Sequence, residues 1–222
     1  MNPQLLQIKS INYGLWVRDG AAGIGTITYY EPETKKFGAL GHGIIDADTE
    51  KLIQIESGEL VKSNIINIQK GEAGIPGQIK GTISKEEAMG NITSNTNFGI
   101  YGALINTNAL NISLENEIPV ATRDEIEVGP AKIILTLEND VRKEYDIEIT
   151  RIYRNNNEDN KSMLIRVTDD RLLELTGGII QGMSGAPIVQ NGKFIGAVTH
   201  VFVNSPKEGY AVFGDLMIKQ ST

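Results

Sequence analysis

Short β-type segments make up most of this chain, and that pattern limits the folds open to it more than any other feature. Apolar residues, many of them β-branched, come in short runs that clusters of glycine, proline and asparagine separate. The runs typical of strands are 15–17, 25–30, 60–68, 98–105, 131–137, 144–153, 163–167 and 194–203. Many short strands joined by turns favour a sandwich or a barrel. We therefore predict an all-β fold.

One short helix is predicted within this pattern, at residues 169–175. Thr168 or Asp169 can cap its first turn with a side-chain oxygen, ahead of the apolar pair Leu172 and Leu173. Helical periodicity is otherwise scarce. The polar stretches are expected to form loops, at 91–97 and 155–161.

The strand pattern loosens between residues 106 and 117, which predicts a boundary there between two β subdomains. Residues 1–12 are expected to be an N-terminal extension, and 13–222 the folded domain. With 222 residues, of which 40% are apolar and 22% charged, the chain is long enough to bury a substantial core.

The composition excludes several functions. The chain has 28 acidic and 21 basic residues and no basic block, so nucleic-acid binding is not expected. It has no cysteine, which rules out disulfides, thiolate metal sites and a cysteine nucleophile. Its two histidines and scattered carboxylates show no metal-ligand spacing, so we expect neither a metal nor another cofactor.

The sequence shows no targeting segment. No run approaches the roughly 20 apolar residues that a membrane-spanning helix needs. The first residues also lack the basic start and apolar run of a signal peptide. We expect no membrane contact by this chain alone.

A serine lies among glycines and a proline in QGMSGAPIV, residues 181–189, and could be a nucleophile. A serine hydroxyl reacts only when a base removes its proton and hydrogen-bond donors stabilise the resulting oxyanion. Because Gly182 has no side chain, its N–H and that of Ser184 can point to one place, as in chymotrypsin-like enzymes. A simple turn before the next strand is the competing interpretation.

His42 is the predicted base, since GALGH places it after an apolar run at an expected strand end. It lies far upstream of Ser184, which is the order found when base and nucleophile come from two β-barrels. The structural alternative is a packed histidine without a catalytic role. With the serine motif and the strand pattern, we predict a chymotrypsin/trypsin-like double β-barrel with one short helix before the nucleophile.

His200 is the rival base and lies in the strand predicted after Ser184. In a chymotrypsin-like barrel, that strand runs beside the substrate backbone. We therefore predict that Thr199, His200 and Val201 bind substrate. A hydrogen-bonded strand histidine is an equally open interpretation of His200.

A carboxylate should orient the histidine, and the residues alone do not identify it. No aspartate occurs from 49 to 123, where the chymotrypsin-like layout usually has one. The candidates are Asp46 and Asp48, shortly after His42, and Asp169 and Asp170, before Ser184. Asp46 and Asp48 also suit a turn, because aspartate bonds to its own nearby backbone.

The chain resembles the serine peptidase domain of the stage IV sporulation protein B family, from endospore-forming bacteria. The similarity covers about 13–218, and the matching stretches are GLWVRDGAAGIGT (14–26), FGALGHGIIDADT (37–49), GELVKS (58–63) and RVTDDRLLELTGGIIQGMSGAPIVQNGKFIGAVTHVFV (166–203). The family is assigned a trypsin-like fold and a His/Asp/Ser triad. The resemblance places that triad at His42, Asp169 and Ser184.

The resemblance also implies a biological role. The family's protease is exported from the forespore into the space between the forespore and mother-cell membranes. There it cleaves itself and the regulatory subunit of an intramembrane metalloprotease, which triggers activation of late sigma factor K. Family members carry a membrane anchor and a PDZ domain, and neither is expected in this chain. The residue before the serine is Met183, where trypsin-like zymogens have aspartate, so activation by N-terminal insertion is not expected.

Two other functions compete with a serine endopeptidase. The first is a catalytically silent trypsin-like domain that binds extended peptides by strand addition. The second is an esterase, which would need G-x-S-x-G before a helix; residues 182–186 lack the last glycine and precede an expected strand. The endopeptidase is the favoured prediction.

Overall fold

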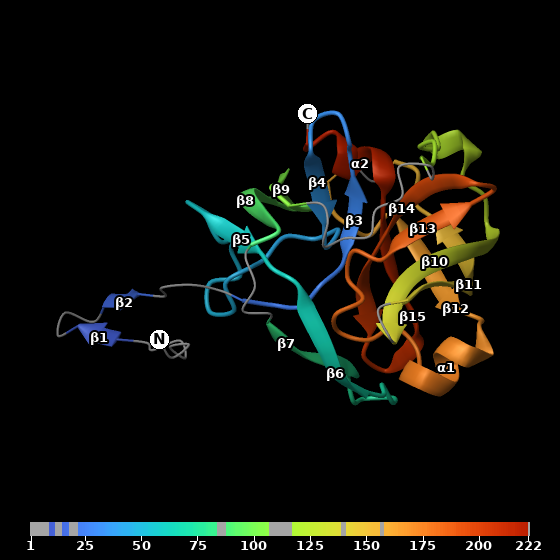
Figure 1. Ribbon diagram of the computed structural model, residues 1–222. Helices are drawn as coiled ribbons and strands as arrows, with labels where there is room; N and C mark the ends of the chain where they lie inside the picture. The colour runs from blue at the N-terminus through green and yellow to red at the C-terminus, as the bar shows by residue number, and fades with distance from the viewer. Residues whose placement is uncertain are drawn as a thin grey trace.

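The computed structural model describes residues 22–83, 88–106, 117–138, 141–155 and 158–221, together with the backbone of 9–11 and 15–17. The N-terminal and C-terminal halves lie side by side (Figure 1). Two strands, β1 (Lys9–Ile11) and β2 (Leu15–Val17), pair with each other as a separate ribbon. The fold is predominantly β, as the sequence predicted.

The N-terminal half is built on a five-stranded antiparallel sheet with the order β3-β4-β9-β8-β5. Its strands are β3 (Ile27–Tyr30), β4 (Lys36–Ala39), β5 (Gly58–Leu60), β8 (Gly90–Thr96) and β9 (Gly99–Leu104). A small core of four buried residues lies against it, formed by Phe37, Ala39, Ile100 and Leu104.

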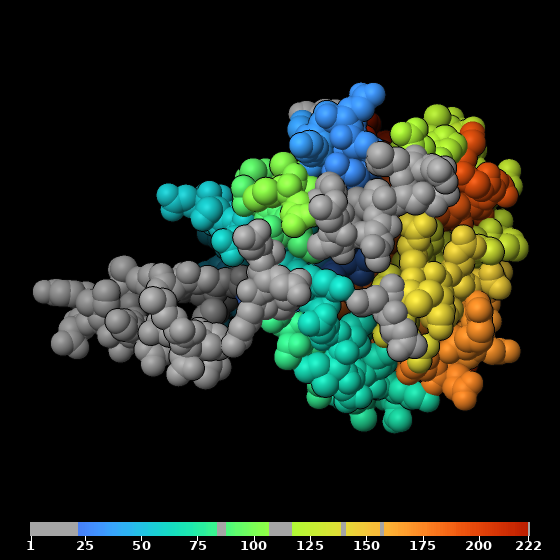
Figure 2. Space-filling view, viewed as in Figure 1, coloured from blue at the N-terminus to red at the C-terminus, as the bar shows by residue number. Residues whose placement is uncertain are grey.

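A second ribbon, β6 (Ser63–Gln69) with β7 (Gln78–Ile83), extends from this half to the other. The N–H of Gly71 donates to the carbonyl of Thr176, and the N–H of Ile79 to that of Gln181. In the space-filling view, the teal atoms of the ribbon meet the C-terminal half at the lower edge of the molecule (Figure 2). The ribbon therefore links the two halves.

The C-terminal half is a closed six-stranded barrel with the order β10-β11-β12-β15-β14-β13. Its strands are β10 (Gly129–Glu138), β11 (Val141–Ile152), β12 (Met163–Val167), β13 (Pro187–Gln190), β14 (Lys193–Phe202) and β15 (Ser205–Phe213). Two helices, α1 (Asp170–Thr176) and α2 (Gly214–Ile218), and a 3-10 turn at Arg123–Glu125 accompany it.

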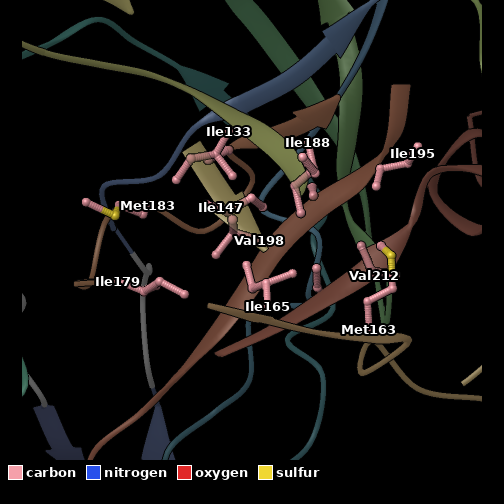
Figure 3. Close-up of a cluster of buried hydrophobic side chains, with 14 of the residues drawn as sticks. Ile133, Ile147, Met163, Ile165, Ile179, Met183, Ile188, Ile195, Val198 and Val212 are labelled. Carbon is pink, nitrogen blue, oxygen red and sulfur yellow. The ribbon is translucent and has the colours of Figure 1, made fainter. Parts of the chain in front are cut away.

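Alternating burial along β10 shows why these sequences form a barrel. Ala131, Ile133, Leu135 and Leu137 are buried, while most residues between them remain accessible, as in strands with one face toward a core. Figure 3 shows Ile133 among side chains from neighbouring strands in the barrel interior. The larger and continuous core thus belongs to the C-terminal half.

Several local predictions are confirmed, and others are wrong. The predicted helix 169–175 is α1, with Asp169 as its N-cap. The loop predicted at 91–97 is wrong, because β8 covers Gly90–Thr96. Polar side chains hid this strand: that of Asn95 bonds to the backbone of Ile44 and Ile53 instead of packing in a core.

The domain division stays a prediction. The expected boundary at 106–117 lies almost wholly outside the described residues, as does the expected extension apart from the backbone of 9–11. None of the helices in the described part of the chain has the length and hydropathy that crossing a bilayer requires.

Candidate active site

Ser184 lies in a loop between α1 and β13 that a buried methionine anchors. The Met183 side chain is fully buried and contributes to the barrel core (Figure 3). Gly182 has φ of +102° and Gly185 has φ of +91°, so the chain turns sharply on either side of the serine. The Ser184 hydroxyl donates to the carbonyl of Thr199 on β14 at 3.0 Å.

Two backbone N–H groups of this loop are available as donors. The N–H of Met183 donates to the Ile180 carbonyl and that of Gly185 to the Val198 carbonyl. Within the described ranges, the N–H groups of Gly182 and Ser184 donate to no other protein group. This arrangement, free amides at the serine and two residues before it, is the one an oxyanion hole requires.

His42 follows β4 in a second tight turn, where Leu40 and Gly41 both have positive φ. A Cβ on Gly41 would lie 3.1 Å from Cγ2 of Thr199 and 3.2 Å from Cγ1 of Val212. The His42 turn is therefore packed directly against β14 and β15, on the barrel that carries Ser184.

Thr26 joins the two loops, and sequence reasoning missed it. Its N–H donates to the carbonyl of Ser184 at 2.9 Å, and its own carbonyl accepts the N–H of Leu40 at 3.2 Å. Its hydroxyl donates to the Gly182 carbonyl. One residue thus fixes the spacing between the serine loop and the histidine loop. In the sequence it lies near the start of the predicted strand 25–30, directly after a glycine-rich run, and no local pattern marks its role.

The backbone around His42 selects one tautomer of its neutral ring. Nδ1 lies 3.0 Å from the carbonyl oxygen of Gly43. A carbonyl only accepts, so this hydrogen bond requires a proton on Nδ1 and leaves a lone pair on Nε2 of the neutral ring. The Asn95 amide, which sequence reasoning placed in a loop, holds the next residue by bonding to both the N–H and the carbonyl of Ile44.

His200 lies beside His42, with ring centroids 5.1 Å apart. Part of its side chain is exposed, yet partial burial, and then the neighbouring His42 ring, lowers the pKa of His200 to about 4. The ring is therefore neutral at pH 7.

The proposed substrate residues share one stretch of β14. His200 pairs with Tyr210 and Val201 with Gly209, both on β15, whereas β13 pairs with β14 only as far as Ala197. The serine loop continues this edge at Val198, whose N–H donates to the Ala186 carbonyl and whose carbonyl accepts the N–H of Gly185; beyond Val198, no described strand covers it. Thr199 itself is buried, and its hydroxyl donates to the Asn160 carbonyl.

Asp169 lies where β12 leads into α1. Its carboxylate caps α1 by accepting the N–H groups of Arg171 and Leu172, and it forms an ion pair with the Arg171 guanidinium at 2.7 Å. None of the hydrogen bonds among the described residues joins Asp169 to His42.

The other candidate carboxylates are Asp46, Asp48 and Asp170. Oδ1 of Asp46 accepts the N–H groups of Asp48 and Thr49, which is the turn geometry expected for aspartate. Asp170, the first residue of α1, is exposed. In the described part of the chain, no three histidine or acidic side chains cluster as metal ligands.

The fold and the site together define a serine protease with a trypsin-like fold: a buried-methionine loop presents a serine between two free amides, and a histidine loop is tied to it. The chain belongs to the SpoIVB peptidase S55 family, whose family model matches residues 9–218.

Comparison with solved structures gives more distant similarities. The chain is similar to the HtrA-type protease AlgW with a decapeptide (TM-score 0.42, 15% identity, 64% of this chain and 40% of that one). It is also similar to the Rv3671c protease from M. tuberculosis in its inactive form (TM-score 0.40, 14% identity, 60% of this chain and 66% of that one). The similarity thus spans less than half of the AlgW chain. No curated protein matches the sequence.

Proposed function

We propose that this serine protease is an endopeptidase in which Ser184 is the nucleophile and His42 the general base. The observation that carries the proposal is the pair of free N–H groups at Gly182 and Ser184, held by Thr26 against the His42 turn. Such preorganised donors stabilise the oxyanion of acyl transfer.

The reaction begins when the Ser184 hydroxyl leaves the Thr199 carbonyl and turns to His42. Nε2 of His42 takes the hydroxyl proton while Oγ attacks the substrate carbonyl carbon. The carbonyl oxygen becomes an oxyanion that the Gly182 and Ser184 amides bind. His42 then donates its proton to the leaving amine, and water removes the acyl group by the same steps in reverse.

The uncovered edge of β14 supports binding of an extended peptide. Main-chain groups at residues 199–201 can pair with a substrate strand in the manner of β-strand addition. Thr199, His200 and Val201 would then line the substrate backbone. No cofactor takes part in these steps.

The sporulation role is proposed from family membership alone. The protease would be exported from the forespore into the space between the forespore and mother-cell membranes. It would there cleave itself and the regulatory subunit of an intramembrane metalloprotease, and so trigger late sigma factor K activation. The triad assignment of Asp169 also rests on family membership and stays a prediction.

Labelling with a fluorophosphonate tests the reaction. Wild-type protein should be labelled at Ser184, and Ser184→Ala and His42→Ala should not be labelled. If the wild type remains unlabelled and cuts no peptide from an unbiased peptide library, the endopeptidase proposal is wrong.

The competing function is a silent domain that binds extended peptides, which the uncovered β14 edge and the Ser184–Thr199 hydrogen bond favour. The same library distinguishes the two. A silent domain would retain peptides without cutting them, and Ser184→Ala would retain the same peptides as the wild type.

A further inference from the structure

We propose that His42 and His200 together bind a divalent transition-metal ion such as Zn²⁺, and that the bound ion reversibly inhibits the protease. The binding step does not depend on the proposed function, whereas the inhibition rests on it. The two histidines are far apart in the sequence, so their spacing could not indicate a metal site, but the fold brings their rings together.

The separation of the two rings fits a shared ion. Their centroids lie 5.1 Å apart, and the ring planes are inclined by 38°. A tetrahedral zinc ion has Zn–N bonds of about 2.0–2.1 Å, which places the centroids of two bound imidazoles roughly 5 Å apart. The inclination lies between the stacked and edge-to-face arrangements that aromatic pairs prefer. The geometry thus suits two metal ligands better than a simple aromatic contact.

The backbone under both rings is held in place. His42 follows Gly41, and His200 follows Thr199. These two preceding residues touch, since a Cβ on Gly41 would lie 3.1 Å from Cγ2 of Thr199. The Thr199 hydroxyl in turn donates to the Asn160 carbonyl. Ligands that are already positioned favour binding, because little has to be ordered when the ion arrives.

His42 offers its Nε2 atom to a metal ion. Its Nδ1–H donates to the Gly43 carbonyl, so the lone pair of the neutral ring is on Nε2. Metal-bound histidines typically donate their other ring N–H to a carbonyl or a carboxylate in this way. The Ser184 hydroxyl donates its proton to the Thr199 carbonyl, and therefore not to Nε2.

His200 supplies the second nitrogen. In the part of the chain that the structure describes, neither of its ring nitrogens forms a hydrogen bond with the protein. Part of its side chain is exposed, so an ion can reach it from solution. Because burial of the rest lowers the pKa of His200 to about 4, a lone pair is available at pH 7. The charges that act on this ring, those of Lys161 and Asp159, have opposite signs and partly offset each other.

Two nitrogen ligands select the kind of ion and its effect. Imidazole suits Zn²⁺ and its transition-metal neighbours, whereas Mg²⁺ and Ca²⁺ prefer oxygen. Among the described residues, no third histidine or carboxylate joins the pair, so water completes the coordination. An ion on Nε2 of His42 takes the lone pair that must accept the Ser184 proton. The ion is therefore an inhibitor and not a cofactor.

Calorimetric titration with Zn²⁺ tests the binding without turnover. Chelator-treated Ser184→Ala protein, which cannot cut itself, should bind one Zn²⁺ per chain at pH 7. In that background, His200→Gln should bind at least roughly 10-fold more weakly, since loss of even an outer-shell partner costs a metal site 10–100-fold. Asp170→Asn, which removes an exposed carboxylate from α1, is the control and should bind as tightly as its parent. Equal affinity with and without His200 would overturn the inference.

Nuclear magnetic resonance identifies the ligands. The chain has two histidines, so the ¹⁵N ring signals are few and His42→Ala assigns them. One equivalent of Zn²⁺ should shift the signals of both rings together, while His42 stays protonated at Nδ1. The same amount of Mg²⁺ should shift neither. A shift confined to one ring, or equal shifts with Mg²⁺, would contradict a shared site.

Fluorophosphonate labelling tests the inhibition. Zn²⁺ should slow the labelling of Ser184 in the wild type, and a chelator should restore the rate. Rates with and without Zn²⁺ are compared within each variant, because His200 is also predicted to bind substrate. At the Zn²⁺ concentration that halves the wild-type rate, His200→Gln should keep nearly all of its own zinc-free rate.

The readouts distinguish the two failures. If the wild type binds Zn²⁺ but is labelled at an unchanged rate, the inhibition is wrong. If the wild type is unlabelled even without Zn²⁺, the endopeptidase proposal and the inhibition fail together, while calorimetry and the ring signals still decide whether His42 and His200 bind the ion.

Discussion

The two halves of this protease carry the proposed catalytic groups in different ways. Ser184 and the oxyanion amides belong to a closed barrel, and Met183 anchors their loop in its continuous core. His42 leaves a five-stranded sheet with four buried core residues, and its position depends on contacts with the barrel and with Asn95. The proposed nucleophile and oxyanion hole are thus built into one core, whereas the proposed base is held at an interface.

The largest expected effect is a loss of stability in the N-terminal half, which has the smaller core. Phe37 is fully buried in the small core of the N-terminal half. Phe37→Ala should lower the free energy of unfolding by about 3–5 kcal/mol, because it leaves a cavity with few neighbours to fill it. Hydrogen exchange should show β4 and β9 opening while the barrel amides stay protected. In the matched barrel variant, Ile165→Ala, hydrogen exchange should increase in both halves together. If Phe37→Ala also opens both halves equally, the two halves unfold as one cooperative unit.

The next effect concerns the oxyanion loop of the barrel. Gly182→Ala imposes a Cβ at φ of +102° and at 3.0 Å from Ile79, so the N–H must turn away from the oxyanion. Loss of one such donor lowers kcat by about 10²–10³. Gly192→Ala is the control, since it has φ of +74° but nothing within 4 Å of the added Cβ. Similar losses of kcat in both variants would mean that backbone strain alone is responsible.

A smaller effect is expected where the histidine loop meets β8. Asn95→Ala leaves the N–H and carbonyl of Ile44 without their amide partner, which should destabilise the fold by about 1–3 kcal/mol. Peptidase activity should fall by more than the loss of folded protein at 25 °C explains, because Ile44 lies only two residues after His42. Labelling kinetics alongside urea unfolding measure both quantities. Unchanged labelling in a destabilised variant would show that the position of His42 does not depend on Asn95.

The smallest effect is the pH dependence due to His200. Its folded pKa of about 4 lies below the ordinary 6.5, so the unfolded chain binds more protons between these values. His200 therefore contributes stability that is complete above pH 6.5 and is lost as the pH falls to about 4. His200→Gln should flatten the urea midpoint between pH 7 and pH 5 relative to wild type. If the midpoint of the variant falls as steeply as that of wild type, groups other than His200 cause the pH dependence.

The sequence predicts the C-terminal half better than the N-terminal half. Regular alternation of apolar and polar residues predicts strands such as β10 and β12, and Asp169 before paired leucines predicts α1. In the N-terminal half, β8 is strand despite its asparagines, because Asn95 bonds to backbone across a loop distant in sequence. No local pattern contains that information.

The candidate site follows the same division. The glycines around Ser184 have a local cause, the positive φ of the turn, and so the motif can be found in sequence. The roles of Thr26, Asn95 and the Gly43 carbonyl arise from hydrogen bonds that only the folded chain defines. The resemblance named Asp169, but its five hydrogen bonds could not be read from spacing.

The hydrogen bonds of Thr26 also order events while the protein is being made. Thr26 and Leu40 leave the ribosome long before Ser184, yet Thr26 bonds to both Leu40 and Ser184 in the folded protein, and so joins the proposed base to the proposed nucleophile. Contacts so distant along the chain form late, after the loop between them has closed. We therefore expect the proposed pair of His42 and Ser184 to form only once synthesis has passed the last strands of the barrel.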